Sequence, residues 1–182
     1  MKLYKKLLAC FTDSKKESKT KGKFILYKIV DYDEDNYLIQ CINTRGIIPM
    51  SLEEILCDVV ILFGLHPIQS CFVGIEYIRT NLTHPFLKIT QKNCISSYQN
   101  SRYGKYNLLF QNRDGLVGFE CKTTDEIYIR EPSEIALAKK IIEEFDAIQA
   151  FYIGVMAGRQ FAKNPNTQRE TNKKKHLRLV VG

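Results

Sequence analysis

The pattern of apolar and polar residues changes several times along the chain. Apolar residues recur at helical spacing in residues 1–11, which predicts a short amphipathic helix. Residues 12–23 are almost entirely polar and rich in lysine, as is typical of a flexible linker. A helix this short is not stable alone in water, so we expect it to dock on its own domain, on a partner or on a lipid surface.

Residues 24–163 predict a single globular domain that begins with strands. β-Branched and aromatic residues concentrate in segments 24–30 and 37–43, which predict an antiparallel hairpin. Segments 105–112 and 116–122 predict a second hairpin, whose turn contains Gly115 because glycine tolerates a positive φ. Segment 126–130 predicts a further strand.

Two regions of the same domain predict helices. Ser51 and Glu54 have the spacing of a capping box, and the helix they begin is expected to end at Gly64 in the left-handed conformation. Pro67 suits the first turn of a second helix, so residues of about 51–80 predict a helical hairpin. A long apolar stripe predicts one C-terminal helix over about 133–162. Helices packed on antiparallel hairpins make an α+β fold.

Composition narrows the class of protein. The chain is 45% hydrophobic and 11% aromatic, which excludes a mainly disordered protein. The apolar stretch between Lys6 and Cys10 is too short for an export signal, and no two cysteines have the spacing of a redox or zinc motif. We therefore expect a cytoplasmic protein with reduced thiols.

The formal net charge of +7 is unevenly distributed. Residues 1–23 and residues 159–182 each carry +6, whereas residues 24–158 carry −5. The sequence thus predicts a mildly acidic domain with two basic ends, the second of which is a basic tail over residues 164–182. A partner attracted by positive charge would contact these ends.

Small residues recur on one face of the predicted C-terminal helix, among them Ala150, Gly154 and Gly158. Each glycine in a helix interior costs about 1 kcal/mol, so we expect a compensating feature. The helix could end or kink near Gly154, another element of the chain could pack closely against it, or the face could be a seam for self-association.

Cysteine and histidine residues raise the alternative of a metal site or a catalytic pair. Cys57, His66, Cys71, His84 and Cys94 include zinc ligands and candidate nucleophile–base pairs. Their spacing matches no known framework, and the chain has no phosphate-binding or hydrolase motif. We therefore expect no metal, no cofactor and no catalytic residue, and a Cys/His-dependent enzyme is the third hypothesis.

An RNA- or DNA-associated protein is the second hypothesis. Aromatic rings can stack on bases, and lysine and arginine can neutralise phosphates. The candidate residues lie before the second hairpin and in the tail: Tyr98, Arg102, Tyr103, Lys105, Tyr106, Lys173, Lys174, Lys175 and Arg178. The chain carries no recognised nucleic-acid-binding module, and its central domain is acidic.

The leading hypothesis is a non-catalytic interaction protein that acts as a subunit or adaptor of a larger assembly. It would dock through its N-terminal helix, its basic tail and the small-residue helix face. The predicted partner-binding residues are Leu3, Tyr4, Leu7, Leu8, Phe11, Ala150, Gly154 and Gly158. We expect other protein subunits as partners, with nucleic acid or a homo-oligomer as alternatives, and disfavour a membrane surface.

Overall fold

The computed structural model describes residues 25–33, 35–80 and 104–163, and this part of the chain has the α+β fold predicted from the sequence. It contains two three-stranded antiparallel sheets, with strand orders β1-β2-β3 and β4-β5-β6. The elements of the first half are β1 (Tyr27–Asp33), β2 (Asn36–Cys41), β3 (Ile47–Ser51), α2 (Leu52–Cys57), α3 (Val59–Gly64) and α4 (Pro67–Arg79). Those of the second half are β4 (Tyr106–Gln111), β5 (Val117–Cys121), β6 (Ile127–Arg130), α6 (Pro132–Leu137), α7 (Lys139–Ile142) and α8 (Ala147–Lys163).

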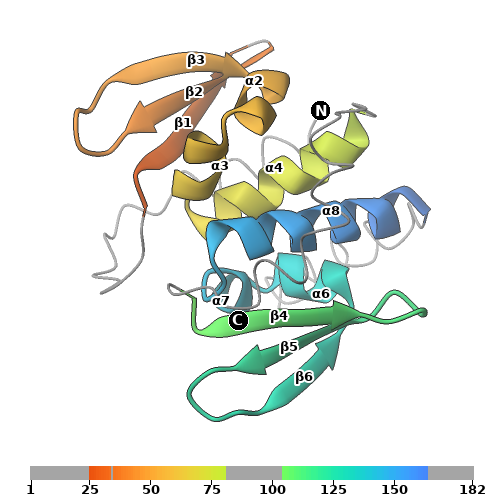
Figure 1. The fold of residues 1–182 in the computed structure, drawn as a ribbon. Helices are drawn as coiled ribbons and strands as arrows, with labels where there is room; N and C mark the ends of the chain where they lie inside the picture. Colours follow the sequence, from red (N-terminus) through yellow and green to blue (C-terminus); the bar gives the residue numbers. More distant parts are fainter. Residues whose placement is uncertain (1–24, 34, 81–103, 164–182) are drawn as a thin grey trace, which may run out of the picture.

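The two sheets lie at opposite ends of the molecule, and the helices lie between them (Figure 1). The two longest helices, α4 and α8, pack side by side at the centre. Each sheet therefore has an inner face toward the helices and an outer face that is not covered by them.

Five of the strands match predicted segments with shifted ends, and Gly115 adopts the expected positive φ of 83° in its turn. Strand β3 was not predicted. It contains Pro49, which cannot donate a hydrogen bond and normally argues against a strand. The sheet accommodates Pro49 because β3 is an edge strand.

The predicted helix boundaries were wrong in two places. The first helix is interrupted at Asp58, whose backbone is extended (φ −93°, ψ 93°) and whose carboxylate accepts hydrogen bonds from the N–H groups of Val60 and Ile61, so that a new helix, α3, begins. Gly64 is the last residue of α3 and has no left-handed conformation, because Gly115 is the one glycine with positive φ in the described ranges.

The predicted long C-terminal helix is three helices. The chain leaves helical geometry at Ala138 (φ −87°, ψ 86°) and again between α7 and α8. Asp146 Oδ1 accepts a hydrogen bond of 2.7 Å from the N–H of Gln149, which caps the start of α8. Apolar periodicity continues through both breaks, so it did not reveal them.

The second half of the chain repeats the architecture of the first half. Both halves have the order of three strands, two short helices and one long helix, and from β2 onward equivalent residues differ by 80 in number. Ten equivalent positions carry the same residue: Cys41/Cys121, Thr44/Thr124, Ile47/Ile127, Glu54/Glu134, Ile55/Ile135, Ile61/Ile141, Ile68/Ile148, Gln69/Gln149, Gly74/Gly154 and Arg79/Arg159.

Unusual backbone features recur at the same equivalent positions. Arg45 and Asp125 are the two residues other than glycine with positive φ (60° and 57°) in the described part of the chain. The helix breaks at Asp58 and Ala138 are also equivalent, and their dihedral angles agree within 7°. Each sheet has a register shift at the corresponding point of its first strand. We infer that the two halves are copies of one structural unit.

The two units meet at a seam of glycines between α4 and α8. A Cβ atom placed on Gly74 would lie 2.2 Å from the carbonyl oxygen of Phe151, and one placed on Gly154 would lie 2.0 Å from that of Cys71. Because Cys71 and Phe151 are themselves equivalent, the contact is reciprocal and lies near a pseudo-twofold axis. Close packing within the chain thus compensates for the low helix propensity of Gly154. Helix α8 continues without a break to Lys163.

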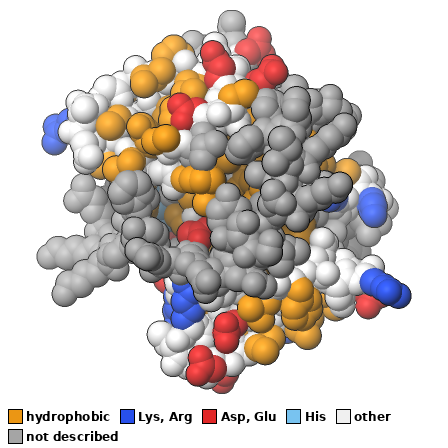
Figure 2. Space-filling view, viewed as in Figure 1, with side chains coloured by type: hydrophobic (Ala, Val, Ile, Leu, Met, Phe, Trp, Pro, Cys, Tyr) orange, Lys and Arg blue, Asp and Glu red, His pale blue; other side chains and the backbone are white. Residues whose placement is uncertain are grey.

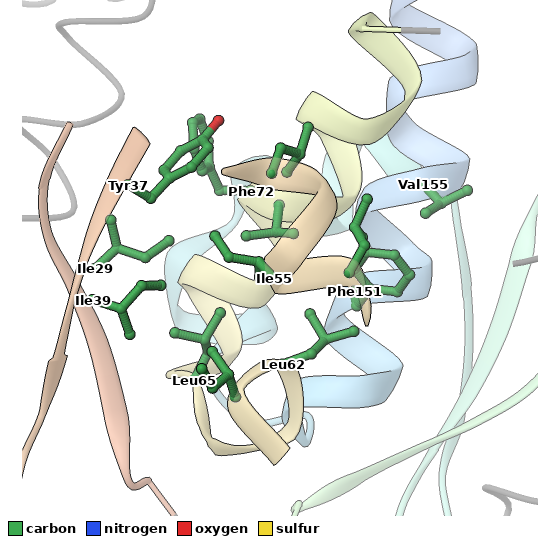
Figure 3. Close-up of a cluster of buried hydrophobic side chains, with 13 residues drawn as sticks. Ile29, Tyr37, Ile39, Ile55, Leu62, Leu65, Phe72, Phe151 and Val155 are labelled. Atoms are coloured by element: carbon green, nitrogen blue, oxygen red, sulfur yellow. The ribbon is translucent and has the colours of Figure 1, made fainter. Parts of the chain in front are cut away.

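Two hydrophobic clusters fill the space between the central helices and the sheets. One joins Ile29 and Ile39 of the first sheet to Phe151 and Val155 of α8 (Figure 3). The other contains Phe119 of β5 and packs on the opposite side of the central helices. The first cluster thus contains residues of α8 from the second unit, and the second cluster contains Ile68 and Cys71 of α4 from the first unit, so neither unit has a core made only from its own residues.

A buried glutamine holds the irregular part of β1. Gln69 on α4 accepts a hydrogen bond of 3.0 Å from the N–H of Ile29 and donates one of 2.8 Å to the carbonyl of the same residue. The β1–β2 register shifts directly after Ile29, which takes these backbone groups out of the regular ladder. Gln149 occupies the equivalent position on α8 and is also buried.

We expect Gln69→Leu to lower the free energy of unfolding by about 2 kcal/mol or more, since it leaves two buried backbone groups without partners. Urea denaturation measures this change. Gln111→Leu is the matched control, because Gln111 is exposed and its amide makes one long hydrogen bond of 3.4 Å. An equal loss in both variants would contradict the role assigned to Gln69.

Candidate interaction surface

The structure places only three of the predicted partner-binding residues. Ala150, Gly154 and Gly158 are buried where α8 packs against α4, as in the close-packing interpretation of this helix face. Their surface is therefore used within the chain. The other predicted residues, Leu3, Tyr4, Leu7, Leu8 and Phe11, lie outside the described residues.

The structure also places two of the predicted nucleic-acid-binding residues. Lys105 is exposed, and its Nζ lies 5.7 Å from the centroid of the Tyr106 ring. That ring packs in an aromatic cluster, with centroids 5.2 Å from Phe119 and 5.4 Å from Phe145, so it is not presented for stacking on a base. Outside the described residues lie Tyr98, Arg102, Tyr103, Lys173, Lys174, Lys175 and Arg178.

The described cysteines have different environments. Burial raises the pKa of the Cys71 thiol to about 12, which disfavours the thiolate that a nucleophile needs. Hydrogen bonds from Thr123 and Thr124 lower the pKa of Cys121 to about 7. Cys121 and its equivalent Cys41 both end a middle strand and precede the turn with positive φ. The two cysteines thus occupy equivalent positions at the start of the same kind of turn.

The other elements of a Cys/His site are dispersed. His66 is the N-cap of α4, where its Nδ1 accepts a hydrogen bond from the N–H of Ile68. Cys57 is exposed on α2. Within the described ranges no three His, Cys, Asp or Glu side chains are grouped so that they could hold a metal ion. His84 and Cys94 lie outside those ranges.

Large apolar side chains are exposed on the third strand of each sheet. Ile47 and Ile48 of β3 are 54% and 49% exposed, and Ile127 and Ile129 of β6 are 61% and 48% exposed. These four are half of the eight large hydrophobic residues that are exposed in the described part of the chain. Figure 2 shows hydrophobic side chains gathered on the lower part of the molecule, where Figure 1 places the second sheet. Clustering of this kind on edge strands is typical of protein-binding surfaces.

Among the described residues, no strand pairs with the outer edge of β6, where Arg130 Nη1 donates a hydrogen bond of 3.2 Å to the carbonyl of Ile129. The N–H of Cys121 donates to the carbonyl of Glu126 at 2.9 Å, so Glu126 directs its polar backbone groups toward β5. Hydrogen-bonding direction alternates along an antiparallel strand, so Tyr128 and Arg130 also bond toward β5. Ile127 and Ile129 therefore direct their N–H and C=O groups away from the sheet.

The corresponding edge of β3 is partly blocked. By the same alternation, set by the 2.9 Å bond from the N–H of Cys41 to the carbonyl of Gly46, Ile47 and Pro49 face the free edge. Pro49 has no N–H, and it is equivalent to Ile129 of β6. The two edge strands thus share exposed isoleucines but differ in their capacity to pair.

Charge over the described residues is mildly negative. They contain 11 Lys and Arg against 16 Asp and Glu, an excess of five acidic residues. Glu126 directly precedes β6, and Arg130 is its last residue. Hydrogen bonds from Tyr128 and Thr124 lower the pKa of Glu126, so this carboxylate is charged at neutral pH.

Sequence patterns had not singled out these isoleucines. A usable signal was present in residues 126–130, where Ile127 and Ile129 alternate with Glu126, Tyr128 and Arg130. A period of two places the isoleucines on one face of the strand. Without the three-dimensional structure this pattern does not show that the face is solvent-exposed.

No protein-family model matches the chain, and neither a curated protein nor a solved structure is significantly similar to it. None of the helices in the described ranges is long and apolar enough to cross a membrane. Function is therefore inferred from the geometry of this chain.

Proposed function

We propose that the protein is a non-catalytic interaction protein of the cytoplasm, a subunit or adaptor of a larger assembly, and that β3 and β6 are docking strands. The observation that carries this proposal is the concentration of exposed isoleucines on these two strands, 48–61% exposed at edges of the sheets. Soluble proteins usually protect edge strands with charge or by covering them. Exposed apolar edges are retained where a partner covers them.

The amphipathic helix predicted from residues 1–11 and the basic tail extend the same proposal. Each combines apolar residues with lysine or arginine, which suits docking in a groove or along an acidic surface. In this arrangement the structured units provide a rigid body, and the two ends provide further attachment points. Free thiols at Cys41, Cys57, Cys71 and Cys121 agree with a reducing compartment.

The test is a quantitative affinity purification with the full chain and two variants. Ile47→Asp introduces a charge into the proposed docking strand, and burying a charge against an apolar partner is costly. We expect it to reduce the recovery of specific co-purifying proteins by about tenfold or more, equivalent to about 1.4 kcal/mol.

Val60→Asp is the matched control, because Val60 is an apolar residue of similar exposure (62% against 54% for Ile47) but lies on α3, away from both edges. Thermal unfolding verifies that both variants are folded. Equal recovery with Ile47→Asp and Val60→Asp would count against docking by β3. A full chain that retains no protein above an unrelated bait would overturn the assembly role itself.

A further inference from the structure

We propose that β6 pairs with β6 of a second copy of this chain, in antiparallel orientation about a twofold axis through Tyr128. The two sheets would join into one of six strands, β4-β5-β6-β6-β5-β4. The inference deepens the proposed function by naming the partner of one of its two docking strands, and it concerns the purified protein alone.

The backbone geometry is self-complementary in this register. Centring the axis on Tyr128 places Ile127 opposite Ile129 of the second copy, and Ile129 opposite its Ile127. These are the two residues of β6 whose N–H and C=O groups face the open edge. Opposed outward-facing residues exchange two hydrogen bonds per pair, so four would form. Tyr128, which bonds toward β5, lies on the axis as a pair without direct hydrogen bonds.

The side chains are complementary in the same register. Apolar Ile127 meets apolar Ile129 on the outer face. On the inner face, Glu126 meets Arg130 of the second copy, and the pair occurs twice. Cross-strand pairs of opposite charge and of β-branched residues stabilise antiparallel sheets by about 0.2–1 kcal/mol each.

Neighbouring registers lose this complementarity. An axis through Ile129 would place Glu131 opposite Ile127, setting a charged residue against an exposed apolar one. An axis between two residues would place Ile127 opposite Arg130, which point to different faces of the sheet. The axis through Tyr128 is the register that satisfies both the backbone and the charges.

The first sheet provides an internal contrast. Pro49 stands where β6 has Ile129, so the same pairing on β3 would lack a donor from each chain. In addition, the N–H of Ser51 is bound by Glu54 Oε2 at 2.7 Å in the capping box. The second copy is therefore assigned to β6 and not to β3.

Sedimentation velocity of the purified full chain tests the pairing. The strand is short, so we expect a reversible dimer of twice the 21.1 kDa chain mass, with a dissociation constant of about 1–100 µM. Ile129→Pro copies the block found in the first sheet and should raise this constant about tenfold or more. Val60→Asp, away from the edge, should leave it unchanged.

Charge complementation tests the register without altering the backbone. Arg130→Glu and Glu126→Arg alone each create two like-charge pairs, so each should weaken the dimer about tenfold. An equimolar mixture of the two variants restores two opposite-charge pairs in the heterodimer and should recover association close to that of the natural chain.

A natural chain that stays monomeric at about 500 µM would overturn the proposal. The proposal would also be overturned by a dimer whose dissociation constant is unchanged by Ile129→Pro and that shows no charge complementation, because such a dimer would use another surface. Neither result would touch the proposed function, which is decided by Ile47→Asp and the co-purifying proteins. If Ile47→Asp loses the co-purifying proteins while the natural chain does not self-associate, the assembly role is supported and this dimer is rejected.

Discussion

Replacing Gly154 with alanine is expected to destabilise the protein by about 2 kcal/mol or more, the opposite of its usual effect in a helix. On an exposed helix the change would stabilise by about 1 kcal/mol through helix propensity. Here the new Cβ atom would lie 2.0 Å from the backbone carbonyl of Cys71, so α4 and α8 must move apart. Overpacking of this kind typically costs about 1–3 kcal/mol and sometimes more.

Gly158→Ala is the control on the same helix. A Cβ atom placed there would lie 3.0 Å from Ile78 Cβ and 3.3 Å from the backbone of Ile75, a much milder overlap than at Gly154, so strain and helix propensity should nearly cancel. Urea unfolding of both variants gives the two free energies. A Gly154→Ala protein as stable as the natural one would show that α4 and α8 do not meet at this point.

Replacing Phe145 with alanine is expected to cost about 3–5 kcal/mol, the range for removal of a fully buried aromatic side chain. The ring is 1% exposed, and its centroid lies 5.4 Å from that of Tyr106 and 5.3 Å from that of Phe119. Its loss leaves a cavity at the centre of the second hydrophobic cluster, where the surrounding rings are held by both the sheet and the helices.

Phe145→Leu keeps an apolar side chain at this site but changes its shape, so it distinguishes the contribution of hydrophobicity from that of packing. The first unit has Leu65 at the equivalent position, also 1% exposed, so the unit itself accepts leucine there. We expect this variant to cost about 1–2 kcal/mol, less than half of the alanine effect. Equal losses for alanine and leucine would mean that Phe145 does not fill a confined space.

The sequence predicted the elements of the fold better than their ends. Runs of β-branched and aromatic residues together with turn signals identified five strands, and the capping box at Ser51 forms as predicted, with both of its hydrogen bonds present. The breaks at Asp58 and Ala138 were missed because the apolar residues on either side keep helical spacing. At Ala138 no residue type marks the change of direction, which is set by tertiary packing.

The duplication was also not predicted. An offset of 80 aligns ten identical residues, but many other equivalent positions differ in class, and several buried positions share only apolar character, such as Ile39 with Phe119 and Val73 with Ile153. Cores tolerate exchange among apolar residues, as at Leu65 and Phe145. The two units can therefore lose sequence identity while they keep the same fold. The glycine pair Gly74 and Gly154 is the exception, because no other residue fits the seam.

The candidate surface could be predicted only in part. Alternation in residues 126–130 indicates which side chains share a face, but exposure depends on how the whole sheet packs. The small-residue face of α8 illustrates the reverse problem. Its pattern correctly indicates close approach of another element, and only the fold shows that this element is α4 of the same chain.

Pro49 has a consequence for the size of any assembly built through sheet edges. A molecule with two open edges could add a neighbour at each end, and such growth continues into a filament. With pairing confined to β6, two copies use each other's β6 edge, and the β3 strand of each copy, which carries Pro49, cannot add a further copy in the same way. Divergence of the two units at a single position, proline in one and isoleucine in the other, would thus convert a polymerising body into one that stops at two copies.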